Sequence, residues 1–231
     1  MIGIIGAMQT EVDGLIQNIR DLRIEKVSGF EFALGYIGEH EVAVVRSGVG
    51  KVNAAVCAQT LILTYRPEVV INSGVAGSLS PKLDILDVAV AIDAVQHDYD
   101  TTGLGEPPGA LSIGGELVTV LPCSEIWRER LLRAAQAAGV HAVPARIASG
   151  DQFITRREDK QRIVDTFQAE VCEMEGASIA QVCCLAGVPC AILRAISDST
   201  DESHQMEYVA FLPKAVANTL KIMKCLLEET C

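Results

Sequence analysis

Short apolar runs of strand length alternate with amphipathic helical patterns along the whole chain. Continuous or alternating apolar residues predict strands, and apolar residues that recur every three to four positions predict helices. The predicted strands are Ile2–Gly6, Phe30–Ile37, Glu41–Arg46, Val69–Asn72, Asp87–Val95, Val143–Ser149 and Cys190–Ser197. The predicted helices are Thr10–Arg20, Gly50–Tyr65, Glu125–Ala138, Thr155–Phe167, Glu175–Ala186 and Glu207–Glu228. This alternation predicts a single α/β domain over residues 1–231, with a mixed central sheet flanked by helices on both faces.

Two segments lack this periodicity. The glycine-rich stretch Ser73–Ser78 follows a predicted strand and predicts a turn, because glycine adopts backbone conformations that other residues avoid. Residues 98–116 are rich in glycine and proline and predict a long loop. Loops of that length inside a compact domain are usually functional, so we expect this one to take part in function.

The composition limits the functions open to the chain. With 231 residues, of which 49% are hydrophobic, it can bury one sizeable core. Its net charge of −11 argues against binding to nucleic acid or to an anionic membrane, since both need a basic surface. No stretch of about 18 apolar residues lacks a charge, so we expect no membrane span.

The N-terminus and the cysteines both indicate a cytoplasmic protein. Met1–Gly6 has no basic region, and the chain turns polar directly after it, which predicts a core strand rather than a signal peptide. Eight cysteines are then expected as free and mostly buried thiols. No two of them have C-x-x-C spacing, which argues against zinc and thioredoxin-like chemistry.

Three carboxylates from distant parts of the chain stand where a cleft is expected. Ligands of open α/β sheets bind beyond the carboxyl ends of the strands. Glu11 and Asp198 each follow a predicted strand, and Glu175 begins a predicted helix. Cleavage of an N-glycosidic bond needs an acid for the departing base, a base for water and a group that holds the ribose hydroxyls. Three carboxyl groups in different environments can divide these roles.

Each of these residues also has a structural interpretation that the pattern leaves open. Glu11, Glu173 and Glu175 could complement a helix dipole, and Asp198 could cap a turn. Arg194 inside a buried strand is different, because a buried charge needs a carboxylate or a polar ligand beside it.

Six motifs, taken together, resemble the 5′-methylthioadenosine/S-adenosylhomocysteine nucleosidases. They are Ile2–Val12, Ser47–Val52, Ile71–Gly77, Ser149–Ile154, Glu173–Glu175 and Leu193–Asp198. They occur in the family's order and spacing across nearly the whole chain. The resemblance implies a nucleoside phosphorylase-like α/β fold, a homodimer without metal or cofactor, and hydrolysis of these two nucleosides to adenine and a 5-thio-substituted ribose. It also implies a place in methionine salvage and nucleoside catabolism.

The resemblance further implies roles for individual residues. Asp198 would protonate adenine N7, Glu11 would activate the attacking water, and Arg194 would lie near that water. Glu175 would hold the ribose hydroxyls. The other implied substrate-binding positions are Met8, Val49, Val75, Phe153, Ile154, Glu173, Met174, Ser197 and Tyr208, with Thr101 and Leu104 on the 98–105 loop.

The resemblance also implies which part of the nucleoside these residues contact. Met174 would pack on the sugar. Phe153 would stack on adenine, and the backbone of Ile154 would read its edge. Met8, Val49 and Tyr208 would surround the 5′-alkylthio group, and the 98–105 loop would reach the partner subunit's site. The chain departs from the family pattern at Val75, Ser78, Thr101, Leu104 and Tyr208 and in a short loop at 106–114, and these departures concern the 5′ group more than the reaction.

Three alternatives remain open. A phosphorylase of the same fold would use phosphate instead of water, with Arg46 and Arg194 as candidate ligands. The loop Ala7–Glu11 argues against it, because it has no arginine and carries a carboxylate that would repel phosphate. The second alternative is a hydrolase of another 5′-modified adenosine such as aminodeoxyfutalosine. The third is a non-catalytic nucleoside-binding protein, which would not need both Glu11 and Asp198.

Overall fold

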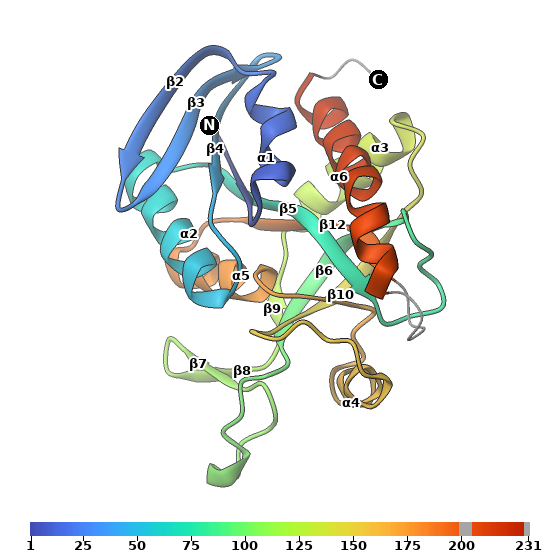
Figure 1. Ribbon diagram of the computed structural model, residues 1–231. Helices are drawn as coiled ribbons and strands as arrows, with labels where there is room; N and C mark the ends of the chain where they lie inside the picture. The colour runs from blue at the N-terminus through green and yellow to red at the C-terminus, as the bar shows by residue number, and fades with distance from the viewer. Residues whose placement is uncertain (199–204, 229–231) are drawn as a thin grey trace.

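The computed structural model describes residues 1–198 and 205–228, and the side chains of residues 205–208 lie outside the described part. Within it, ten strands form one sheet (Figure 1), in which the short strand β9 pairs with β6. The order of the other nine is β11-β10-β6-β12-β5-β1-β4-β3-β2. From β1 on, their bounds are Ile2–Gly6, Arg20–Val27, Phe30–Ile37, His40–Arg46, Val69–Ser78, Val88–Gln96 (β6), Leu121–Pro122 (β9), Ala142–Ser149, Val171–Glu173 and Cys190–Asp198 (β12).

The sheet is mixed and partly closed on itself. β1 pairs in parallel with β4 and β5, and β12 is parallel to β5 but antiparallel to β6. β11 also pairs antiparallel with β5, so that β5, β12, β6, β10 and β11 close into a ring. This closure brings the ends of β5, β10, β11 and β12 close together, and the candidate site lies there.

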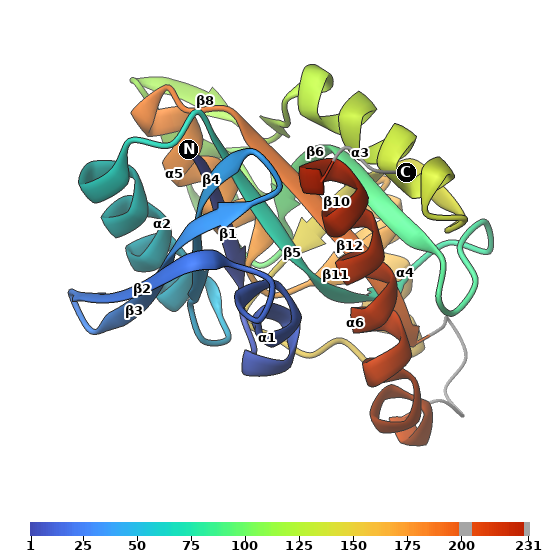
Figure 2. The same cartoon turned by 90° about the horizontal axis from the view of Figure 1, so that it is seen from above.

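Helices cover both faces of the sheet (Figure 2). Their bounds are Gln9–Ile16 (α1), Lys51–Tyr65 (α2), Glu125–Ala137 (α3), Arg157–Phe167 (α4), Gly176–Ala186 (α5) and Gln205–Glu228 (α6). Residues of α2 and α5 share one buried apolar cluster, whereas residues of α1, α3 and α6 share another. α4 packs on a third and smaller cluster through Ile163 and Phe167. The predicted α/β fold with a mixed sheet is therefore confirmed.

The glycine-rich stretch Ser73–Ser78 is not the predicted turn, because β5 continues through it to Ser78. Glycine is needed here for close approach. A Cβ added at Gly74 would lie 2.3 Å from Nη1 of Arg194 and 2.6 Å from Oε1 of Glu11. A Cβ added at Gly77 would lie 2.7 Å from Oδ2 of Asp198. The glycines of β5 thus make room for side chains of the cleft.

Other predicted boundaries also differ from the structure. The first helix ends at Ile16 instead of Arg20, because the chain turns there and enters the unpredicted strand β2. The helix predicted to begin at Thr155 begins at Arg157 instead, since Arg156 is the N-cap of α4. The predicted 98–116 loop contains a short 3-10 helix, η1 (Thr102–Leu104), and runs into a hairpin of β7 (Leu111–Ile113) and β8 (Glu116–Val118). This segment extends away from the sheet at the bottom of Figure 1.

Of the seven cysteines in the described part of the chain, six are free, as predicted: Cys57, Cys123, Cys172, Cys183, Cys184 and Cys190. Cys225 is bonded in a disulfide, so the prediction of free thiols is wrong at this position. Among the described helices, none combines the length and the apolar character needed to cross a membrane.

Candidate active site

A cleft with about 630 Å³ of open space lies at the carboxyl ends of β1, β5, β11 and β12. It brings together twelve of the predicted site residues, which come from all six motifs of the chain. They are Met8, Glu11, Val49, Val75, Phe153, Ile154, Glu173, Met174, Glu175, Arg194, Ser197 and Asp198. The residues that the sequence placed after separate strands therefore share one cavity, as expected for an open α/β sheet.

Glu11 is held by backbone donors on both of its carboxylate oxygens. Its Oε2 accepts hydrogen bonds from the N–H groups of Ala7 (2.8 Å) and Met8 (2.9 Å), and its Oε1 accepts one from Val75 (3.1 Å). The side chain is 5% exposed. Burial raises the pKa of Glu11, while the nearby Arg194 and these N–H donors oppose the rise. A buried carboxylate with a raised pKa is suited to accept a proton near neutral pH.

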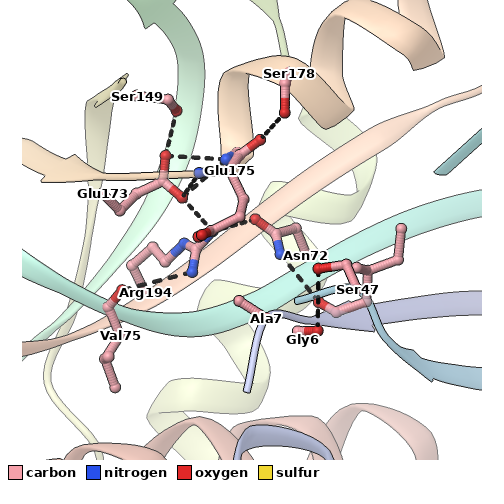
Figure 3. A network of polar contacts seen from close by, with 12 residues as sticks. Gly6, Ala7, Ser47, Asn72, Val75, Ser149, Glu173, Glu175, Ser178 and Arg194 are labelled. Atoms are coloured by element: carbon pink, nitrogen blue, oxygen red, sulfur yellow. Dashed lines mark hydrogen bonds and ion pairs between the residues drawn. The ribbon is translucent and has the colours of Figure 1, made fainter. Parts of the chain in front are cut away.

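Arg194 is the buried cation at the centre of the site (Figure 3). It reaches from β12 into a ring of acceptors, and its side chain is 1% exposed. Its Nη2 donates to Oδ1 of Asn72 and Oε2 of Glu173, and lies 3.5 Å from Oε2 of Glu175. Its Nη1 donates to the carbonyl of Val75 at 3.5 Å. The partner that the sequence required for this buried charge is therefore a pair of carboxylates and an amide.

Glu173 has a structural role, because its carboxylate binds backbone and side-chain groups of the protein itself. Its carboxylate accepts from the backbone N–H groups of Glu175 (3.0 Å) and Gly176 (2.8 Å), at the N-terminus of α5. It also accepts from the hydroxyl of Ser149 and from Arg194. These contacts combine helix N-terminal stabilisation with an ion pair, so Glu173 fixes the orientation of Arg194 and of the segment that carries Glu175.

Glu175 has fewer partners and a strongly shifted pKa. Its Oε1 accepts the N–H of Gly50 at 3.0 Å, and its side chain is 5% exposed. Burial and the neighbouring Glu173 raise the pKa of Glu175 to about 7, although Arg194 and the Gly50 N–H oppose this. Perturbed carboxyl groups of this kind cluster at functional sites.

Asp198 ends β12 and lines the cleft. Its Oδ1 accepts a hydrogen bond from the hydroxyl of Ser197 at 2.9 Å, and the residue is 9% exposed. A register shift in the pairing of β12 with β5 sets Asp198 opposite Gly77. Because glycine leaves space there, the carboxyl group can face the cavity.

Several cleft residues were not predicted from the sequence. Lys160 on α4 is 8% exposed and lines the cleft together with Cys172 on β11. Asn72 anchors Arg194 and donates from Nδ2 to the carbonyl of Ile5 at 3.0 Å. A usable signal existed for the glycines of β5, because glycine inside a strand often marks a close approach. Asn72 and Lys160 have no comparable local signal.

Some predicted positions do not line this cleft. Thr101 and Leu104 lie on the protruding loop, where Leu104 is 82% exposed. Arg46 is exposed and does not line the cleft either, so the structure does not support it as a phosphate ligand. Tyr208 belongs to α6, but its side chain lies outside the described part. Nowhere in residues 1–198 and 205–228 do three or more potential ligand side chains gather in an arrangement that could hold a metal ion.

Comparison with known proteins gives the same family over the whole chain. The model of the phosphorylase superfamily matches residues 1–228. The aminodeoxyfutalosine nucleosidase of Helicobacter pylori is 37% identical, with 99% of this chain and 98% of the relative covered. The 5′-methylthioadenosine/S-adenosylhomocysteine nucleosidase of Staphylococcus aureus is 35% identical, with 99% and 100% covered.

A solved structure supports the same family assignment. It is a mutant of the Helicobacter pylori 5′-methylthioadenosine/S-adenosylhomocysteine nucleosidase with 5′-methylthioadenosine in the active site. It matches with a TM-score of 0.92 at 35% identity, over 99% of this chain and 98% of that chain. The chain therefore belongs to the phosphorylase superfamily and, within it, to the family of the 5′-methylthioadenosine/S-adenosylhomocysteine nucleosidases. The resemblance predicted from the six motifs is confirmed.

Proposed function

We propose that this protein hydrolyses the N-glycosidic bond of 5′-methylthioadenosine and S-adenosylhomocysteine, releasing adenine and a 5-thio-substituted ribose. The observation that carries the proposal is the placement of Glu11, whose buried carboxylate lies in the same cleft as Asp198 and Glu175. The two named relatives support it, since both are nucleosidases. This reaction would supply adenine and the thiosugar to methionine salvage.

The three carboxyl groups divide the work of the reaction. Asp198 protonates N7 of adenine, which turns the base into a better leaving group. As the bond breaks, positive charge develops on the sugar, and the carboxylates of Glu11 and Glu175 stabilise it electrostatically. Glu175 holds the ribose hydroxyls, and Glu11 takes a proton from the attacking water. Phe153 stacks on the base, while Met174 packs on the sugar.

Hydrolysis fits the charges of the cleft better than phosphorolysis. Four carboxyl groups line it against two cationic side chains, Arg194 and Lys160. The Nη groups of Arg194 already bind Asn72, Glu173, Glu175 and Val75, which leaves them poorly placed to clamp a phosphate dianion. Glu11 also stands in the first turn of α1, shortly after β1, where it would repel that dianion.

Identifying the reaction products distinguishes hydrolysis from phosphorolysis and from non-catalytic binding. Incubation with 5′-methylthioadenosine should release adenine and free 5-methylthioribose at a rate that added phosphate does not change. A sugar 1-phosphate formed only with phosphate would contradict hydrolysis. Absence of adenine release from either nucleoside would favour a non-catalytic binding protein.

A second substrate is supported by one comparison. The relative from Helicobacter pylori that is 37% identical is named an aminodeoxyfutalosine nucleosidase. Its substrate shares the adenine nucleoside core, so the same acid and base would serve. Competition between 6-amino-6-deoxyfutalosine and 5′-methylthioadenosine, measured as the ratio of kcat/KM, ranks the two substrates.

We also propose that the enzyme is a cytoplasmic homodimer. Thr101 and Leu104 do not line the cleft of their own chain, and α2 exposes Val52 (73%) and Leu63 (69%). Apolar area of this kind favours burial in an isologous interface. Light scattering at micromolar concentration should give about twice the chain mass of 24.7 kDa. A fully active species of single-chain mass would contradict the dimer. Of the seven cysteines that the structure describes, six are free and only Cys225 is disulfide-bonded, and this predominance of free thiols supports the cytoplasmic location.

The pKa of about 7 for Glu175 predicts a pH dependence. Only the ionised carboxylate offers both oxygens to the ribose hydroxyls, so kcat/KM should rise with pH and level off above about 7. In Glu175→Gln we expect kcat/KM to be lower at every pH and to lose this bend in its pH profile near 7. An unchanged bend near 7 in that variant would assign it to another group. Because the pKa of Glu175 is raised in the folded state, this group contributes stability at low pH that is lost as pH rises from 4.5 to about 7.

A further inference from the structure

Three segments of the chain meet in one polar cluster outside the machinery described above. Lys51 is the first residue of α2, Asp98 lies two residues after β6, and Asp151 lies two residues after β10. The ammonium of Lys51 donates to Oδ1 of Asp98 at 2.6 Å. The backbone N–H of Lys51 donates to Oδ1 of Asp151 at 2.7 Å, and the N–H of Asp151 donates to Oδ2 of Asp98 at 2.8 Å. The three residues thus form a closed cycle of charge-assisted hydrogen bonds.

The cluster is sheltered and has further support. The side chains of Lys51 and Asp98 are each 17% exposed. Lys51 also donates to Oε1 of Gln96 at 3.0 Å, and Gln96 donates to Gln181 of α5 at 2.6 Å. Burial tends to raise the pKa of Asp98, but Lys51 and the Asp151 N–H outweigh it, so its pKa lies below the ordinary value. An ion pair this sheltered is screened less than a surface pair and can restrain the backbone.

Two of the three segments of the cycle continue directly into residues of the cleft. Gly50, the residue before Lys51, donates its N–H to Glu175 at 3.0 Å. Asp151 precedes Gln152, Phe153 and Ile154, which line the cleft. No helix or strand covers residues 150–156, and Phe153 is 56% exposed. The loop that carries Phe153 therefore depends on contacts such as those of Asp151 to keep its place.

We propose that Lys51, Asp98 and Asp151 are positioning residues that hold Phe153 and Ile154 against the base and keep the Gly50 N–H on Glu175. The proposal rests on the function proposed above, because it assigns these segments to the base and the ribose. Glu11 on α1 and Asp198 at the end of β12 are held by contacts of their own. Loss of the cycle should therefore weaken nucleoside binding and leave the chemical step of the bound substrate nearly intact.

The test compares Lys51→Met and Asp98→Ala with wild type. In each variant we expect KM for 5′-methylthioadenosine, and the Kd of adenine measured by calorimetry, to rise about tenfold, the effect of one lost charge-assisted bond. We expect kcat to stay within about threefold. Lys51→Arg, which keeps the charge and the donors, should restore both constants to within about twofold of wild type. The double variant should lose little more than either single one, since both break the same cycle.

Lys26→Met is the matched control, because Lys26 forms an ion pair of 2.7 Å with Glu31 in which the side chains are 76% and 62% exposed. It should behave as wild type. If a Lys51 or Asp98 variant does not fold, Asp151→Ala takes its place, since that side chain is exposed. Unchanged KM and adenine Kd, or a fall in kcat alone, would overturn the proposal. A wild type without turnover would instead contradict the proposed function, and adenine binding would still report on the cluster.

Discussion

Asp198→Asn is expected to lower kcat by about 10²–10⁴-fold, the range that a general acid contributes. Adenine leaves poorly as an anion, so the reaction needs a proton donor beside N7 of the base. Asparagine has nearly the shape of aspartate and can still accept the hydrogen bond from Ser197, which Asp198 accepts at 2.9 Å. The amide has no comparable proton to give. Steady-state adenine release at saturating 5′-methylthioadenosine measures the loss.

The control for this variant is Asp165→Asn on α4, whose exposed side chain accepts a hydrogen bond from Gln161 within the same helix. It should keep the wild-type kcat. Circular dichroism and the Tm of both variants check that the fold is intact. If folded Asp198→Asn keeps more than about a tenth of wild-type kcat, Asp198 does not act as the acid.

The buried strands could be predicted from the sequence because their apolar runs are continuous. β1 has the predicted bounds, and β12 extends one residue beyond them. β2 was missed because charged residues dominate its sequence Arg20–Val27, the few apolar residues do not alternate regularly with them, and almost all of its residues are exposed. β2 is extended because it pairs with β3 at the edge of the sheet, and β3 itself was predicted correctly. Edge strands of this kind carry little hydrophobic signal.

The glycine-rich end of β5 shows a different limit. Local propensity favours a turn at Ser73–Ser78, yet the chain stays extended because it pairs with β12 and β11. The reason for glycine lies in Glu11, Arg194 and Asp198, which approach this strand from other elements. Tertiary contacts therefore outweigh the local preference of this glycine-rich segment for a turn. Such conflicts between local preference and fold are expected at functional sites such as this cleft.

The candidate site could be predicted in part because its residues follow strand ends. Position after a strand, together with the family motifs, was enough to gather Glu11, Glu175 and Asp198 in one cleft. The residues that bind the side chain of Arg194 could not be predicted from the sequence. Asn72 lies 122 residues away in sequence, within an apolar run that carries no sign of a polar contact. Pairings of that range depend on sheet order, which the sequence pattern leaves undetermined.

Glu11→Gln is expected to lower kcat by about 10²–10⁴-fold, because it removes the base that takes a proton from water. The glutamine oxygen can replace Oε2, which accepts the N–H groups of Ala7 and Met8. The new amide group then faces the N–H of Val75, which Oε1 accepts in the wild type at 3.1 Å. One buried donor loses its acceptor, so the Tm should fall, by an amount equivalent to about 1–3 kcal/mol.

Binding separates the two roles that Glu11 could have. A 5′-methylthio nucleoside whose base is joined through a carbon–carbon bond cannot be hydrolysed and reports ground-state affinity. Its Kd should stay within about threefold of wild type in Glu11→Gln, because the proposed binding mode assigns the main contacts to Phe153, Met174 and Glu175. Glu129→Gln, at a side chain 58% exposed on α3, is the matched control and should change neither constant. If Kd rises as much as kcat falls, Glu11 is a substrate ligand, and the water must be activated by another group in the cleft.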